Sequence, residues 1–422
     1  MSCLEDLKEI PVVGEYDVLV VGGGPAGVSA AVSAAKTGVK VAIVERYGYL
    51  GGQATGGLVI LLVGLTDGKN TIVKGFCDDV IKRLGSSNMK KDIGAHILFD
   101  PESLKYIFDC MILENAIMPY YHSFVSGIIE DRGRVFGAVL NGKSGKRIIK
   151  AKTFVDATGD ADFAKYINIP FEQQSKELSM PVTLGFRAGG INILKMSGFI
   201  SSNYKDYLSL LRNLGITTKI GGWIQTLNPC EVWFNIANVE NIDIVDSDDL
   251  TKAEITARRQ IQGIMETFKK NIPGFEDAYL IDTASQIGIR DSRRIKGLYK
   301  FTKEDILTGF EDSIALAPDY TGSGRGFVEI PYGCLVSPES ENVIFAGRCI
   351  SVEHQLLDMF REIPCCMATG QAAGVASAIA VLNSANFHTV DISLIQNVLS
   401  KQGAIFTQED LLKLKGSTDS LV

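Results

Sequence analysis

Short apolar runs alternate with segments of helical periodicity along the chain, which is typical of an α/β protein. Residues 16–21 are β-branched and apolar and predict a buried parallel strand. Residues 28–35 contain the small apolar side chains of a helix that packs closely on a sheet, and residues 39–44 predict a second buried strand. The first part of the chain is therefore expected to form a strand–helix–strand unit.

The same alternation continues through the rest of the chain. Residues 100–115 start with Asp and Pro at the expected N-cap and N1 positions and predict an amphipathic helix. Three alternating runs at 125–129, 135–140 and 147–151 are separated by turn signals and predict an antiparallel meander, while 152–160 predict another strand of the first sheet. We also expect strands at 117–121, 231–236, 279–287, 327–332 and 342–347, and helices at 250–270 and 369–382.

A glycine-rich loop joins the first strand to the first helix, with the sequence Gly22-Gly-Gly24-Pro-Ala-Gly27. Gly22 permits a tight turn, Gly24 lets a pyrophosphate approach the backbone, and Gly27 lets helix and strand pack closely. The helix N-terminus then faces the phosphates, and Glu45, at the end of the second strand, can accept hydrogen bonds from a ribose. This pattern predicts a site for FAD or NAD rather than NADP, the alternative being a structural glycine turn.

A second glycine-rich loop follows at residues 51–57, where four of seven residues are glycine. Such a loop lets the backbone approach a flat or crowded group. A mobile surface loop is the alternative, but the apolar run that follows favours a buried loop.

The composition narrows the functional classes. A chain of 422 residues with 46% hydrophobic content can form two domains, and a net charge of −7 argues against a nucleic-acid-binding surface. The chain contains only four histidines, and its eight cysteines form no C-x-x-C pair or other metal-ligand spacing, so no metal site is expected. The N-terminal residues do not resemble a secretory signal and the apolar run at 56–65 is too short for a membrane span, so we expect a cytoplasmic protein with reduced thiols.

Several segments, in this order, resemble the FAD-dependent oxidoreductases, a broad bacterial group within the glutathione-reductase-type and fumarate-reductase-type flavoproteins. They are residues 20–27, 51–57, 155–160, 289–294, 330–332 and 345–351, followed by His354, Arg361, Pro364 and residues 370–374.

This resemblance implies an α/β fold with a Rossmann-like FAD-binding domain of the glutathione-reductase type and an inserted mixed α+β substrate domain. The FAD-binding domain would comprise residues 1–168 and 326–385, the insert 169–325, and a C-terminal helical tail 386–422.

The resemblance also implies how FAD is held. Its pyrophosphate would lie at residues 22–27 and its adenosine ribose at Glu45, while Gly347 and the start of the 370–382 helix would approach the flavin. The residues expected to bind it are Gly22, Gly24, Pro25, Ala26, Gly27, Glu45, Arg46, Gly52, Gln53, Thr55, Val125, Ala157, Thr158, Gly159, Gly347, Arg348, Gly370, Gln371 and Ala372.

Four differences from related flavoproteins limit the chemistry. The 51–57 loop carries no redox cysteine pair, and Gly322-Ser-Gly324 lacks the strand of a second dinucleotide site. No histidine precedes His96, which favours non-covalent FAD. Gly347-Arg348 replaces the Gly-Asp of aromatic hydroxylases and weakens a monooxygenase interpretation.

Four residues are candidates for catalysis, each with a structural alternative. His354 could act as a general acid or base, and Tyr332 as a weaker proton donor. Arg361 could bind a substrate carboxylate or donate a proton, or it could pair with Glu362, Asp358 or Glu353. Arg290, in a cluster with Arg293 and Arg294, could hold an anionic substrate or form interdomain salt bridges. The adjacent Cys365 and Cys366 are expected to be buried thiols.

The expected function is hydride transfer between flavin N5 and a small organic substrate, an anionic one if the arginine cluster binds it. The alternatives are a flavin-bearing electron-transfer or structural subunit and an NAD-only dehydrogenase. The substrate, the electron acceptor and a homodimeric state are left open by the sequence.

Overall fold

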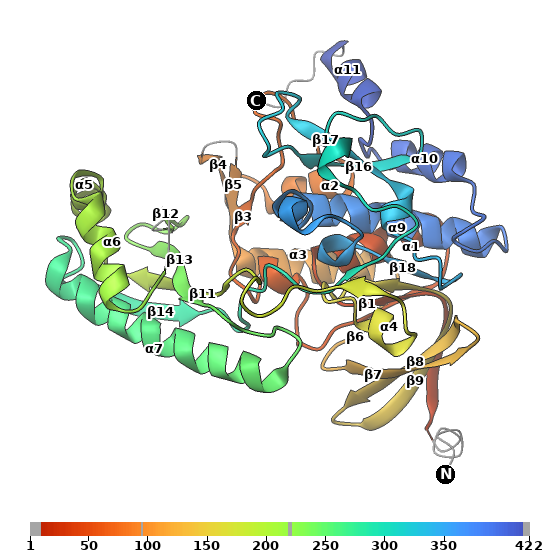
Figure 1. Ribbon diagram of the computed structural model, residues 1–422, viewed down its shortest axis with the longest axis horizontal. Coiled ribbons are helices and arrows are strands. Elements are labelled where there is room, and N and C mark those ends of the chain that lie inside the picture. The colour runs from red at the N-terminus through yellow and green to blue at the C-terminus, as the bar shows by residue number, and fades with distance from the viewer. Residues whose placement is uncertain (1–9, 94–95, 218–221, 417–422) are drawn as a thin grey trace.

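The computed structural model describes residues 10–93, 96–217 and 222–416. It consists of a large α/β unit and a smaller α+β unit at its side (Figure 1). The main sheet has the strand order β6-β2-β1-β9-β8-β7, and β18 pairs with β9. The strands are β1 (Val12–Val21), β2 (Val41–Val44), β6 (Met118–Tyr120), β7 (Phe124–Asp131), β8 (Arg134–Gly142), β9 (Gly145–Asp156) and β18 (Val343–Phe345).

The predicted strand–helix–strand unit is confirmed, because β1 and β2 are parallel and α1 (Pro25–Lys36) connects them. The predicted helix at 100–115 is α3 (Pro101–Glu114), and its N-cap Asp100 accepts a hydrogen bond of 2.7 Å from the N–H of Ser103. Both elements therefore follow from local sequence signals.

The two strands expected at 147–151 and 152–160 are one continuous strand, β9. One edge of β9 pairs in parallel with β1 along nearly its whole length. Its other edge pairs first with the antiparallel β8 and then, from Phe154 onward, with the parallel β18. The meander therefore joins the main sheet without a turn, which the alternating sequence pattern does not reveal.

Helix α9 (Ile363–Leu382) is the central helix of the large unit and packs against α1 (Figure 1). It begins six residues earlier than the pattern predicted. Gly370 and Gly374 make the close approach possible, since a Cβ atom on either would lie 2.1 Å from a backbone oxygen of α1. The length and composition of α9 would suit a membrane span, but 83% of its apolar window is buried, which is the environment of a core helix.

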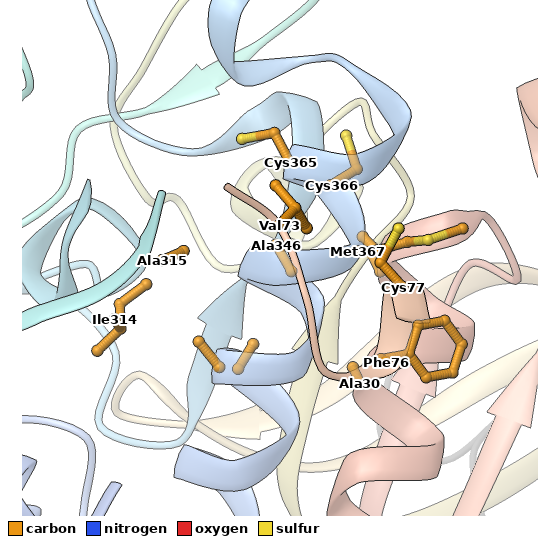
Figure 2. Close-up of a cluster of buried hydrophobic side chains, with 14 of the residues drawn as sticks. Ala30, Val73, Phe76, Cys77, Ile314, Ala315, Ala346, Cys365, Cys366 and Met367 are labelled. Carbon is orange, nitrogen blue, oxygen red and sulfur yellow. The ribbon is translucent and has the colours of Figure 1, made fainter. Parts of the chain in front are cut away.

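Cys365 and Cys366 lie on this helix inside a cluster of apolar side chains (Figure 2). Both are buried, as expected, and burial raises the pKa of each thiol well above its usual value. Their sulfur atoms point to different sides of the helix (Figure 2), in keeping with the rotation between successive helical residues.

The smaller unit is a four-stranded antiparallel sheet covered by helices on one face. Its strand order is β12-β13-β11-β14. The strands are β11 (Val182–Gly189), β12 (Trp223–Gln225), β13 (Val232–Val239) and β14 (Tyr279–Thr283), and the helices are α5 (Ile193–Ser202), α6 (Tyr204–Asn213) and α7 (Ser247–Asn271). Strand β13 and helix α7 confirm the elements predicted near 231–236 and 250–270.

The chain returns to the large unit before residue 326, the expected boundary. Phe301 and residues 314–317 belong to the core that surrounds α1 and α9. There β16 (Ser313–Pro318) pairs with β17 (Phe327–Pro331). The sheet of the smaller unit thus ends at Thr283, and much of the expected insert packs on the large core.

The remaining elements connect or cover these two units. They are α2 (Phe76–Leu84), α4 (Asp162–Tyr166), α8 (Leu357–Phe360), α10 (Ile392–Lys401), α11 (Gln408–Gly416), β3 (Leu61–Leu62), β4 (Met89–Ile93), β5 (His96–Phe99), β10 (Phe171–Glu172) and β15 (Arg294–Ile295). The sheet β3-β5-β4 lies at the side of the large unit nearest to the smaller one (Figure 1).

Candidate functional site

One cavity of about 510 Å³ runs from the N-terminus of α1 to the sheet of the smaller unit. Its walls come from the carboxyl ends of β1, β2 and β9, from the 51–57 loop, and from β11 and β13. The carboxyl ends of parallel strands are where open α/β sheets bind ligands. We call the part beside α1 the dinucleotide end and the part beside β13 the substrate end.

The three glycines of the first loop have different surroundings. Gly22 has a φ of +98°, and a Cβ atom on Gly27 would lie 1.8 Å from the carbonyl oxygen of Gly22. Gly24 has extended backbone, and no described atom beyond its chain neighbours lies within 4 Å of the position of its Cβ. Gly22 and Gly27 are therefore required by the turn and the packing, whereas Gly24 leaves open space in the cavity at the N-cap of α1.

Glu45 is held at the dinucleotide end by backbone donors. The Gly23 N–H donates to Oε2 at 2.7 Å and the Tyr47 N–H donates to Oε1 at 2.9 Å. Burial raises the pKa of this carboxyl group, and the two N–H donors oppose the rise. Each carboxylate oxygen keeps acceptor capacity for a further donor such as a ribose hydroxyl.

The segment 156–160 forms the opposite wall of the dinucleotide end. Asp156 is buried at the end of β9 and accepts hydrogen bonds from Thr158 and from the N–H of Phe163. Burial raises its pKa to about 6. Arg348 donates to Asp160 at 2.8 Å, while its Nη1 atom is buried and has no partner among the described residues.

The residues expected to hold the cofactor fall into two groups. Those that line the cavity are Gly22, Gly24, Pro25, Ala26, Glu45, Arg46, Gly52, Gln53, Val125, Ala157, Thr158, Gly159, Gly347 and Arg348. Those that the structure places behind the lining are Gly27, Thr55, Gly370, Gln371 and Ala372.

The residues of the second group have packing roles. The hydroxyl of Thr55 donates to the carbonyl of Leu50 at 2.7 Å and shapes the second glycine loop. Gln371 accepts a hydrogen bond from the N–H of Phe76. Because α9 begins at Ile363, residues 370–372 lie about two turns inside the helix, and Ile363 and Cys366 are the residues of α9 that line the cavity.

The second glycine loop reaches across to the smaller unit. Gly52, Gln53 and Gly57 line the cavity. The amide of Gln53 donates to the carbonyl of Ile287 at 3.1 Å, and its Oε1 atom is buried without a partner among the described residues. The prediction that this loop is buried is confirmed by the low exposure of residues 50–58.

Strand alternation in the smaller unit builds the wall of the substrate end. Leu184 and Phe186 of β11 pack into the core under α5, α6 and α7. Thr183 and Gly185, on the other face of the same strand, line the cavity. Other lining residues that the sequence did not single out are Trp223, Ile224, Trp233, Asn235 and Gln286.

Arg290 lines the substrate end and is held by neutral groups. Its guanidinium donates to the carbonyl of Pro181 at 2.6 Å, to the hydroxyl of Thr183 and to Oδ1 of Asn235 at 3.1 Å. Among the described residues no carboxylate forms an ion pair with it. Burial, with a contribution from Arg361, lowers its pKa to about 10, which still leaves it charged near neutral pH.

Arg361 and Glu362 line the cavity beside Arg290. Arg361 pairs with Asp358 through an Nη2–Oδ1 distance of 2.7 Å. Burial raises the pKa of Glu362 to about 7. The sequence offered Glu362 only as one of three acids that could pair with Arg361, and no local sequence signal places it at the cavity.

The other candidates lie away from the cavity. His354 is 3.3 Å from Asp291, which also pairs with the fully buried Arg294. Arg293 donates to Asp162 at 2.7 Å. The cluster expected from the sequence is therefore divided between two structural ion pairs and one cavity residue, Arg290.

Tyr332 is buried as well, and its hydroxyl donates to the carbonyl of Phe387 at 3.1 Å. Burial raises its pKa far above the usual value for a tyrosine. The structure does not bring this hydroxyl to the cavity.

Comparisons with known proteins define the class. The family described as FAD dependent oxidoreductase matches residues 17–399. The chain belongs to this family, so FAD rather than NAD is its cofactor and it is an enzyme.

The curated relatives match this chain over only part of their length. The thiamine thiazole synthase of Methanococcus aeolicus is 33% identical over 163 residues, which are 36% of this chain and 57% of that protein. The dihydrolipoyl dehydrogenase of Trypanosoma brucei brucei is 57% identical over 42 residues, which are 10% of this chain and 9% of that protein. The chain thus spans less than two thirds of these curated relatives.

Solved structures resemble the chain over most of its length. A geranylgeranyl bacteriochlorophyll reductase-like protein from Thermoplasma acidophilum has a TM-score of 0.52 at 15% identity, covering 96% of this chain and 87% of that one. A variant of the flavin-dependent brominase Bmp2 has a TM-score of 0.51 at 13% identity, covering 92% and 86%. These similarities show an α/β fold with a Rossmann-like domain, and the family match makes FAD the ligand of that domain.

Two observations indicate that the dinucleotide end suits FAD. The open space at Gly24 lies at the N-cap of α1, which has no side-chain cap. The Glu45 carboxylate lines the same end and is oriented by two backbone donors. A diphosphate and a ribose are the groups that this pair of features suits.

Proposed function

We propose that this protein is an FAD-dependent oxidoreductase that transfers a hydride between FAD and a small organic anion bound at the substrate end. The observation that carries the proposal is that one cavity joins the dinucleotide end to Arg290, a cation without a carboxylate partner among the described residues. A flavin supplies the redox chemistry, and the protein supplies binding and orientation.

We propose the following placement of the cofactor. The pyrophosphate lies over Gly24, the adenosine ribose lies at Glu45, and the flavin extends past Gln53 toward Arg290, held without a covalent bond. Support comes from the shared lining of these residues and from the glycine loop, which leaves backbone free to approach the ring. We also propose the glutathione-reductase arrangement, in which the meander and the smaller unit are added to the nucleotide-binding sheet.

A flavin-bearing subunit without a substrate of its own is the alternative. It would not need a cationic group beyond the dinucleotide end, and the cavity continues past that end to Arg290 and Arg361. The alternative therefore predicts that replacing Arg290 leaves all flavin responses to small anions unchanged.

The test uses purified protein and Arg290→Met. The wild-type protein should show flavin absorbance at about 450 nm. An anaerobic panel of hydroxy, amino and unsaturated carboxylic acids should contain a compound that bleaches it. Arg290→Met should keep the flavin and lose the bleaching. Protein that carries no flavin, or a variant that is bleached as fast as the wild type, would refute the proposal.

A further inference from the structure

Glu362 is an unusual group for the interior of a cavity that is expected to bind an anion. It occupies the N-cap position of α9 with extended backbone, but its side chain makes no capping hydrogen bond. Among the residues that the structure describes, none donates a hydrogen bond to this carboxyl group. The side chain lines the cavity together with Arg290 and Arg361.

We propose that Glu362 is the proton-carrying group of the substrate end, and that an organic carboxylate binds at Arg290 together with one proton on Glu362. This inference rests on the proposed function, since it concerns the same substrate end. It assigns a role to a side chain that the sequence motifs did not indicate.

The ionisation of Glu362 depends on its burial and on the charges that face it. Burial is the largest effect and raises its pKa, Arg361 and Arg290 lower it, and Asp358 raises it. Other titratable groups near it are Tyr320, Cys365 and Cys366, and burial raises the pKa of each, so they are neutral near pH 7. Glu362 is therefore the group of this set that changes charge close to neutrality.

A bound carboxylate couples to this group through Arg290. The negative charge of the ligand offsets the positive charge of Arg290, which otherwise favours ionised Glu362. Binding thus raises the pKa of Glu362 above its value of about 7 in the ligand-free protein. Below that value Glu362 is already protonated, whereas above it the carboxylate binds with uptake of a proton.

The consequence is a defined pH dependence of affinity. From about pH 7 up to the pKa of the ligand-bound state, affinity for a permanently ionised carboxylate falls by up to tenfold per pH unit, because one proton must be taken up. At lower pH, affinity is constant. A neutral ligand of the same shape shows neither the fall nor the proton uptake.

Benzoate is a suitable probe, since it stays ionised above about pH 6 and the wall of the substrate end offers Ile224 and Trp233 as apolar surface. Its binding to the FAD-loaded protein is followed by the change in the flavin spectrum, and proton uptake is followed with a pH indicator in weak buffer. Benzamide is the neutral comparison. Neither measurement depends on turnover.

Three variants separate the contributions. Glu362→Gln should bind benzoate without proton uptake and with an affinity that does not change with pH. Asp358→Asn should move the onset of the pH dependence to lower pH and Arg361→Gln to higher pH, as the signs of their charges require. Glu353→Gln, which changes a glutamate whose carboxylate accepts the N–H of Lys303 outside the cavity lining, should behave as the wild type.

The outcomes distinguish this inference from the proposed function. Proton uptake that persists in Glu362→Gln, pH-independent benzoate binding in the wild type, or flavin-loaded protein with no response to benzoate would each overturn the inference while leaving the FAD assignment in place. Protein without flavin would overturn the proposed function itself.

Discussion

Replacing Gly24 by valine should weaken FAD binding without unfolding the protein. Apart from Gly24 and its two chain neighbours, no atom of the described residues lies within 4 Å of the position of a Cβ atom on Gly24. Its extended backbone is accessible to any L-residue. The free energy of unfolding of the flavin-free protein should therefore change by less than about 1 kcal/mol. The new side chain projects into the space assigned to the pyrophosphate.

The expected loss of affinity follows from the cost of an overpacked contact. Inserting methyl groups into a filled site costs about 1–3 kcal/mol, which corresponds to roughly fivefold to 150-fold weaker FAD binding. Flavin content after dialysis and the dissociation constant of added FAD would measure the loss, and urea unfolding of the flavin-free protein would measure stability.

Gly27→Ala provides the matched comparison in the same loop. Its Cβ atom would lie 1.8 Å from the carbonyl oxygen of Gly22, so this smaller substitution should destabilise the fold itself by more than Gly24→Val does. The reasoning is refuted if Gly24→Val retains FAD with wild-type affinity, or if the two substitutions destabilise the flavin-free protein equally.

Two further predictions concern packing and ribose binding. Gly374→Ala should lower the free energy of unfolding by about 1–3 kcal/mol, because its Cβ would lie 2.1 Å from the backbone of α1. Gly198→Ala in α5, whose Cβ would have no described atom outside its own helix turn within 4 Å, should be neutral or stabilising by up to about 1 kcal/mol. Equal effects in urea unfolding would contradict the packing argument. Glu45→Gln should weaken FAD binding by roughly tenfold to a hundredfold through loss of charge-assisted hydrogen bonds, and an unchanged dissociation constant would show that the ribose does not contact this side chain.

The parts of the site that sequence could predict are those set by local geometry. The first glycine loop and Glu45 come from one strand–helix–strand unit, so short-range spacing was enough to place them at the same end of the cavity. Arg290 was identified as a cation, but its partners Pro181, Thr183 and Asn235 are more than 50 residues away in the chain. Its lack of a carboxylate partner among the described residues is therefore a property of the tertiary structure.

Glu362 illustrates why other parts could not be predicted. In the sequence, the neighbouring Arg361 suggests an ion pair for Glu362, and the helix was expected to begin only at residue 369. In the structure Arg361 pairs with Asp358, one of the acids expected for it, and Glu362 lines the cavity without capping the helix. His354 shows the opposite error, because a histidine after a strand end was expected at the site and lies instead beside the buried Asp291.

The continuous strand β9 constrains how this protein can vary in length. Strand β9 sets both the register of the meander and the position of Asp156 at its end. The carboxylate of Asp156 holds one wall of the cavity in place. Inserting one residue anywhere between Ile148 and Val155 would turn every later side chain of the strand to the opposite face. The Asp156 side chain would then no longer hold that wall. The turn at residues 142–145 can lengthen without this penalty, so evolutionary and engineered insertions should collect in the hairpin tip and spare the strand.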